Sequence, residues 1–119
     1  MFDFEKFPVY QEAELFYLEI LKIFKLNNKI SKDIKDQLKR ASMSIVLNIA
    51  EGAGKYSKND KKNFYVISRG SVNECVALLR ILKLEKIINE QKYIYLYNKL
   101  LSISKMLSGL INTMLYKKH

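Results

Sequence analysis

Few residues in this chain could carry out covalent chemistry. Glu51 and Glu74 are two carboxylates beside apolar helical stripes, and Cys75 is the single cysteine. A serine or cysteine nucleophile needs a neighbouring base, but the only histidine is the terminal residue, His119. Zinc sites use clustered cysteine and histidine, and di-iron bundles repeat Glu-x-x-His pairs; neither pattern is present. The sequence therefore predicts a protein that is not an enzyme and that holds no metal or other cofactor.

The run Glu51-Gly52-Ala53-Gly54-Lys55 closes a helical pattern. A phosphate-binding loop opens a helix instead, so this run does not predict one. Glycine adopts the left-handed backbone conformation on which many helices end. We therefore expect Gly52 and Gly54 to stop the helix by adopting that conformation.

Polar residues near the apolar stripes of two consecutive helical segments predict a shared network. Asn48 and Glu51 precede the glycines, and Ser71 and Glu74 lie on the returning segment. A buried polar group without a partner costs about 1–3 kcal/mol, so these side chains should contact one another. Arg40 is the candidate counter-ion, and we expect it to pair with Glu74 across the helices. These five residues could instead form a functional site, but we favour the structural network.

Lysines offer a different chemistry, contact with a polyanion. The chain has 21 Lys and Arg against 12 Asp and Glu, a net charge of +9. Such an excess promotes salt-sensitive association with nucleic acid, although a lysine-rich proteome with solvated side chains explains it equally well. Lysines beside an aromatic ring suit phosphate contact and base stacking. The candidates form two groups. One is a row on a single helix face, Lys32, Lys35 and Lys39, and the other is a cluster in a turn: Lys55, Tyr56, Lys58, Lys61 and Lys62.

Periodicity predicts the elements that position these residues. Apolar residues recur at three- and four-residue spacing in four segments, and one proline and four glycines leave those segments long. We expect a single all-α domain over residues 1–119, an up-down-up-down antiparallel four-helix bundle. The predicted helices span residues 8–26, 32–53, 58–86 and 90–116. The expected core face of the third helix consists of Phe64, Ile67, Ser71, Cys75, Leu78 and Leu82.

Two predicted helices carry more apolar surface than one core requires. Residues 8–26 carry Leu15, Leu18 and Leu21 outside the core-facing stripe, and residues 32–53 have a second apolar face that includes Met43, Val46 and Leu47. Large exposed apolar patches mark interfaces. We therefore expect a homo-oligomer.

The sequence also bears on location. No apolar run approaches the roughly 20 residues of a membrane-spanning helix. The N-terminus lacks the basic start and apolar middle of a signal peptide. We expect a cytoplasmic protein without membrane association.

Several short motifs are spread over the chain: Val9-Tyr10-Gln11, Gln37-Leu38-Lys39-Arg40-Ala41, Ser44-Ile45, Asn48-Ile49-Ala50-Glu51-Gly52, and Gly70-Ser71 with Glu74. Together they resemble the recurrent pattern of the 23S ribosomal RNA intervening sequence proteins, the S23 family. One departure is Arg69, where members often have a small or apolar residue before the glycine. The resemblance covers essentially the whole chain.

The resemblance implies a left-handed four-helix bundle, often assembled into a ring-like pentamer. Some members are encoded within insertions in bacterial ribosomal RNA genes, and most have no established activity. The accessory variability determinant proteins of diversity-generating retroelements look similar in fold, and they bind a reverse transcriptase and nucleic acid through a basic surface.

Two functions follow as expectations. The first is a non-enzymatic oligomeric bundle that binds nucleic acid, RNA more than DNA, through lysine-rich surfaces. The alternative is a protein-interaction scaffold or accessory subunit whose partner, such as a reverse transcriptase, performs the chemistry.

Overall fold

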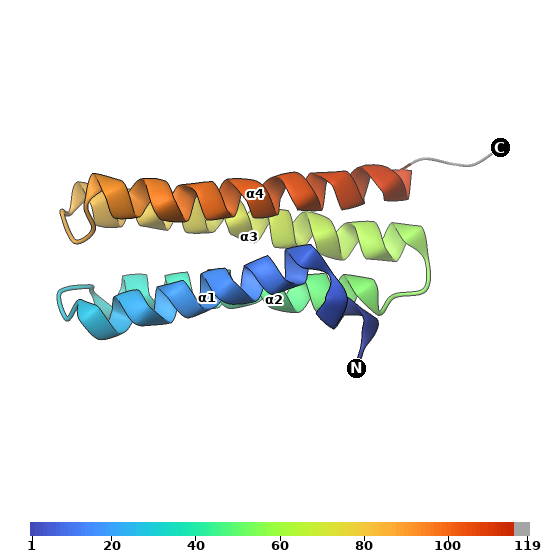
Figure 1. The fold of residues 1–119 in the computed structure, drawn as a ribbon, viewed down its shortest axis with the longest axis horizontal. Helices are drawn as coiled ribbons and strands as arrows, with labels where there is room; N and C mark the ends of the chain where they lie inside the picture. The colour runs from blue at the N-terminus through green and yellow to red at the C-terminus, as the bar shows by residue number, and fades with distance from the viewer. Residues whose placement is uncertain (116–119) are drawn as a thin grey trace.

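Four long helices run alternately in opposite directions along one axis (Figure 1). The computed structural model describes residues 1–115. A short 3-10 turn, η1 (Asp3–Lys6), precedes α1 (Pro8–Leu26), α2 (Lys32–Ala53), α3 (Lys58–Leu84) and α4 (Glu90–Leu115). This confirms the prediction of an all-α four-helix bundle. α3 ends two residues before the expected residue 86, and residue 116, the expected end of the fourth helix, lies outside the described residues.

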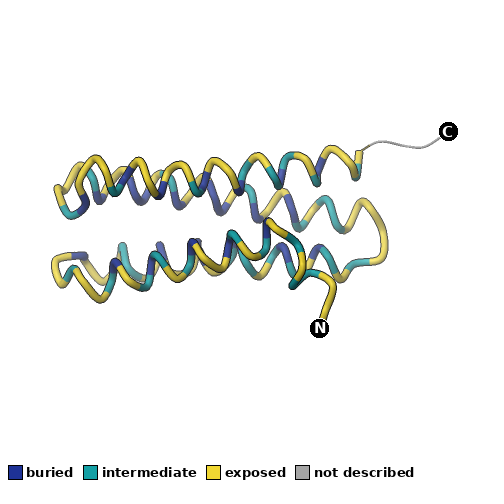
Figure 2. Tube along the Cα trace, in the orientation of Figure 1, coloured by how far each residue is buried: buried dark blue, intermediate teal, exposed yellow. Residues whose placement is uncertain are grey.

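The helices occupy the corners of a square. α1 packs on α2, α2 on α3, α3 on α4, and α4 on α1, whereas the diagonal pairs make no comparable contact within residues 1–115. Figure 2 shows buried positions recurring along the helices towards the middle of the bundle. They form one apolar cluster, which also includes Ile30 and Ile88 from the two loops at one end. Burial of these loop residues anchors both loops to the core.

Local sequence signals explain where the helices begin. Pro8 occupies the first turn of α1, where its missing N–H would have no intrahelical partner. Ser31, Ser57 and Asn89 each accept a hydrogen bond from the backbone N–H three residues later, at 3.3, 3.1 and 2.8 Å. Such caps satisfy donors that the first helical turn leaves unpaired.

The glycines at the end of α2 do not act as the sequence predicted. Gly52 is buried inside the helix, Gly54 caps it with φ −82°, and no described glycine has a positive φ. A Cβ atom on Gly52 would lie 2.8 Å from Cε1 of Tyr65 and 3.1 Å from Cβ of Phe64. Gly52 therefore lets α3 approach α2 closely just before the chain turns back.

α3 also turns a different face to the core near its start. Tyr65 and Ser68 are buried, whereas Ile67, which we expected in the core, is 51% exposed. The hydroxyl of Ser68 donates to the carbonyl oxygen of Ile45 on α2 at 2.8 Å. A serine that is hydrogen-bonded in this way is buried at little cost. Its small size suits the close approach of α2 and α3 better than isoleucine would.

Candidate functional site

A chain of hydrogen bonds joins α2 to α3 near the middle of α2. The hydroxyl oxygens of Ser44 and Ser71 lie 2.8 Å apart. Nδ2 of Asn48 donates to the hydroxyl and to the carbonyl oxygen of Ser44, at 2.9 Å each. The structure thus brings the predicted residues Asn48 and Ser71 together through Ser44. Because these groups bond to one another and to the backbone, the arrangement links two helices and leaves no activated nucleophile.

Three residues predicted for this network lie outside it. Arg40 and Glu74 are exposed, and no ion pair within 4 Å joins them in the described part of the chain. Glu51 is also exposed, with its carboxylate 3.7 Å from Nζ of Lys55. The prediction of a buried Arg40–Glu74 pair is therefore wrong.

The reason for this error is rotational. Each glutamate follows its network residue by three positions, which turns it about 60° around the helix. On both helices this rotation places the glutamate on the side away from the core. The carboxylates therefore stay in water and avoid the desolvation cost of burial.

The predicted lysines fall into two groups at opposite ends of the bundle. Lys32, Lys35 and Lys39 lie in the first turns of α2, at the end that holds the loops 27–31 and 85–89 (Figure 1). The turn lysines lie at the other end, near the N-terminus. At 1.5 Å per residue, the 16 positions from Lys39 to Lys55 span about 24 Å. The two groups therefore do not form one surface on a single chain.

Two turn lysines have structural partners. Nζ of Lys61 donates to the carbonyl oxygen of Ala53 at 2.8 Å and satisfies a terminal acceptor of α2. Nζ of Lys55 lies near the Glu51 carboxylate and 5.1 Å from the centre of the Phe64 ring. Contact with a phosphate would compete with these interactions.

The other members of the turn group face solvent to differing degrees. Tyr56 is completely exposed, so its ring is accessible for stacking on a base. Lys58 is exposed and Lys62 is partly buried. Neither forms an ion pair within 4 Å among residues 1–115.

Sequence reasoning missed further lysines that the fold places near Lys32, Lys35 and Lys39. Lys25 and Lys29 lie at the end of α1 and in the loop after it, and Lys86 lies in the loop between α3 and α4. All three are exposed and reach the same end of the bundle as Lys32. No pattern along the sequence marks this grouping, because it arises only when the up-down topology brings two distant loops to the same end of the bundle.

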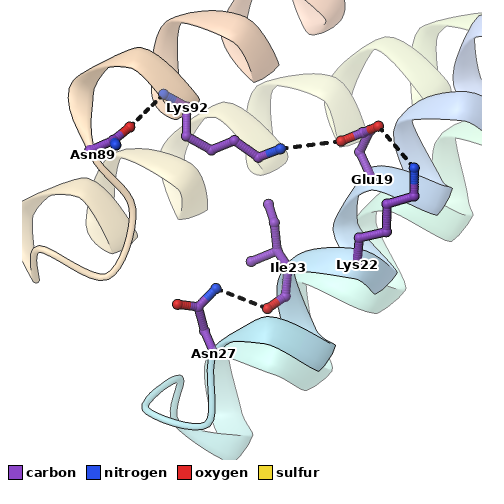
Figure 3. Close-up of polar contacts among 6 residues, drawn as sticks. All are labelled: Glu19, Lys22, Ile23, Asn27, Asn89 and Lys92. Atoms are coloured by element: carbon purple, nitrogen blue, oxygen red, sulfur yellow. Dashed lines mark hydrogen bonds and ion pairs between the residues drawn. The ribbon is translucent and has the colours of Figure 1, made fainter.

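Figure 3 shows how this end is held together. The carboxylate of Glu19 on α1 lies 3.3 Å from Nζ of Lys92 on α4 and 3.5 Å from Nζ of Lys22. Burial alone would raise the pKa of Glu19, but the hydrogen bond and charge of Lys92, with Lys22, outweigh burial and lower that pKa. Nδ2 of Asn27 donates to the carbonyl oxygen of Ile23 at 3.0 Å, which closes the end of α1.

The single cysteine does not form a reactive site. Cys75 is fully buried in the apolar core. Burial, followed by the nearby charge of Glu74, raises the pKa of its thiol far above the usual range. Within residues 1–115 there is also no group of three or more His, Cys, Asp or Glu side chains placed to hold a metal ion.

The fold and the distribution of side chains define a small, basic, all-helical bundle with a structural polar network. The family model of the 23S rRNA-intervening sequence proteins matches residues 5–109, so the chain belongs to that family. No curated protein matches the chain. No helix among the described residues is long and apolar enough to cross a membrane.

A solved structure supports the same assignment. The chain is similar to a protein of unknown function from the S23 ribosomal protein family of Bacteroides thetaiotaomicron, with 26% identity and a TM-score of 0.81. The match covers 87% of this chain and 97% of the other. The resemblance to the S23 family stated from the sequence is therefore confirmed.

Proposed function

We propose that this protein is a non-enzymatic, oligomeric nucleic-acid-binding bundle that acts in the cytoplasm. One observation supports binding. Of the 19 basic side chains in residues 1–115, only five lie within 4 Å of a carboxylate: Lys22, Lys32, Lys55, Lys83 and Lys92. The remaining positive charge is not neutralised inside the molecule and attracts polyanions. The family is named after intervening sequences of 23S ribosomal RNA, and this association with the gene of an RNA makes RNA the nucleic acid that we favour.

An exposed apolar groove supports the oligomer. The groove between α1 and α2 has a volume of 530 Å³ and is lined in part by Leu15, Leu18, Met43 and Val46. Leu15 and Leu18 are each 50% exposed, and Leu47, one helical turn after Met43 on α2, is 54% exposed. A contiguous apolar surface of this kind marks an interface. We assign it to contact between copies of this chain, and the family resemblance favours a pentameric ring.

A salt series tests the binding. Gel-shift titrations with a structured RNA should show an affinity that falls steeply between about 50 and 200 mM salt, because bound lysines release counterions from the phosphates. The same titration with a DNA duplex tests the preference for RNA. Absence of any RNA complex at the lowest ionic strength would overturn the proposal.

Analytical ultracentrifugation tests the oligomer. The native chain should sediment as a multiple of 14.0 kDa. Leu18→Glu should shift it towards the monomer, because a charge in the groove would be desolvated on association. Lys105→Glu, at an exposed position on α4, is the control for a changed surface charge. A native chain that stays monomeric at high concentration would contradict the proposed assembly.

The alternative is a scaffold or accessory subunit for a nucleic-acid enzyme such as a reverse transcriptase. A second groove, of 350 Å³ between α3 and α4, favours a further protein contact. It is lined partly by Val76, Ala77 and Leu101, with Arg80 at its side. Failure to bind RNA at low salt, together with a stable complex with a reverse transcriptase encoded beside its gene, would select this function.

A further inference from the structure

We infer that the phosphate-binding surface is the end of the bundle that holds the loops 27–31 and 85–89, and not the turn between α2 and α3. We call residues 19–39 and 80–92 the loop end, and residues 1–14, 51–62 and 105–115 the turn end, because the last turns of α4 lie beside the start of α1. The ligand of the loop end is the phosphodiester backbone of nucleic acid. This inference rests on the proposed function and specifies the surface that performs it.

Charge distinguishes the two ends. The loop end carries ten basic and five acidic side chains, a net charge of +5. The turn end carries six basic and six acidic side chains, a net charge of zero. A polyanion approaching the bundle is therefore attracted more strongly to the loop end than to the turn end. Sequence order hides this contrast, because the positive charge comes from two segments more than 40 residues apart.

Most of the acidic side chains at the loop end already have a cationic partner. Glu19 is paired with Lys22 and Lys92, while the carboxylates of Asp36 and Glu90 each lie 2.9 Å from a lysine. Six basic side chains at this end form no ion pair within 4 Å in the described chain: Lys25, Lys29, Lys35, Lys39, Arg80 and Lys86. These side chains can contact phosphates without losing an ion pair.

The loops that carry Lys29 and Lys86 are held in place by the core. Ile30 and Ile88 are 5% and 6% exposed, and both belong to the main apolar cluster. Asn27 and Asn89 cap the adjacent helix ends, and the Glu19–Lys92 pair joins α1 to α4 between them (Figure 3). Lysines on ordered loops lose less backbone entropy on binding than lysines on a disordered tail.

Tyr95, an exposed aromatic residue near this end, favours backbone contact over base stacking. Nζ of Lys92 and Nζ of Lys99 lie 5.1 and 5.0 Å from the centre of the Tyr95 ring, so both ammonium groups already form cation–π contacts with it. A base would have to displace one of them. Phosphate contacts alone position a nucleic acid without reading its sequence, so the loop end should bind with little sequence preference.

Two triple variants with the same change in charge test this assignment. Lys25→Gln/Lys29→Gln/Lys86→Gln alters the loop end, and Lys6→Gln/Lys58→Gln/Lys62→Gln alters the turn end. None of the six lysines forms an ion pair within 4 Å among residues 1–115. Circular dichroism and sedimentation of both variants should match the native chain. The probe is a structured RNA hairpin titrated at several salt concentrations.

We expect the loop-end variant to lose at least tenfold in affinity at 100 mM salt. The slope of log K against log salt should fall by about 2 to 3, since each lost phosphate contact removes about one unit. The turn-end variant should bind within about threefold of the native chain, because the overall charge still contributes at long range. A larger loss in the turn-end variant would overturn the inference but leave the proposed function standing. A native chain that does not bind would overturn both.

Footprinting provides a second measurement that needs no variant. Acetylation of lysines in the native chain, with and without the RNA hairpin, should show protection at Lys25, Lys29 and Lys86 and unchanged modification at Lys58. Protection confined to the turn end would refute the assignment.

Discussion

Replacing Gly52 by alanine tests the packing of α2 against α3 most directly. The new Cβ would lie 2.8 and 3.0 Å from two ring carbons of Tyr65, whereas ordinary contacts between such atoms are 3.4 Å or longer. Tyr65 is 2% exposed, so its ring cannot swing into solvent. The ring or the helices must therefore move by about half an ångström in a close-packed core.

The expected change in the free energy of unfolding of Gly52→Ala combines two opposing effects. Overpacking a core typically costs about 1–3 kcal/mol, while replacing glycine by alanine inside a helix gains about 1 kcal/mol. Gly52→Ala should thus lower the free energy of unfolding by up to about 2 kcal/mol. Gly70→Ala and Gly109→Ala are matched controls, because a Cβ there has no neighbour within 4 Å and only the propensity gain applies. Both controls should be neutral or stabilising by up to about 1 kcal/mol.

Urea unfolding followed by circular dichroism measures this difference. All variants must be compared at one protein concentration, because association of the chains would add to the apparent stability. We expect Gly52→Ala to unfold at a lower urea concentration than either control. If it proves as stable as Gly70→Ala, the close approach of α2 and α3 at this glycine does not exist as described.

Three further predictions concern single side chains. Ser68→Ala should lower the free energy of unfolding by about 1 kcal/mol, because it removes a buried hydrogen bond to α2, whereas Ser102→Ala on an exposed position of α4 should be nearly neutral in the same urea assay. Cys75 should react with an aromatic disulfide reagent only after unfolding, since burial raises the pKa of its thiol; rapid labelling in native buffer at pH 8 would disprove this. The pKa of Glu19 is lowered by folding, so its contribution to stability is present above its ordinary pKa of 4.5 and is lost as the pH falls through the lowered value. Between pH 5 and pH 3, the free energy of unfolding of Glu19→Gln should therefore depend less on pH than that of the native chain, and equal dependence would argue against the Glu19–Lys92 pair.

The polar residues illustrate how far sequence reasoning reached. Periodicity placed Asn48 and Ser71 close enough to the core to need partners, and the structure joins them through Ser44. The same reasoning placed Glu51 and Glu74 there as well, although both are exposed. A helical wheel drawn at 100° per residue defines the apolar face only to within about one residue. At the edge of that face, the desolvation cost of the side chain decides whether it enters the core or stays in solvent. A carboxylate at that edge therefore faces water, while a serine or asparagine turns inward.

By itself the sequence determined the helices, their order and their antiparallel arrangement, because these depend on local periodicity, caps and short loops. Only the tertiary structure decided that Gly52 and Ser68 face the neighbouring helix, because close approach depends on atoms from both helices at once. It also decided which lysines share a surface, since Lys29 and Lys86 come together only when two distant loops reach the same end of the bundle. Charge adds up in space and not along the chain, so that surface becomes visible only in the folded molecule.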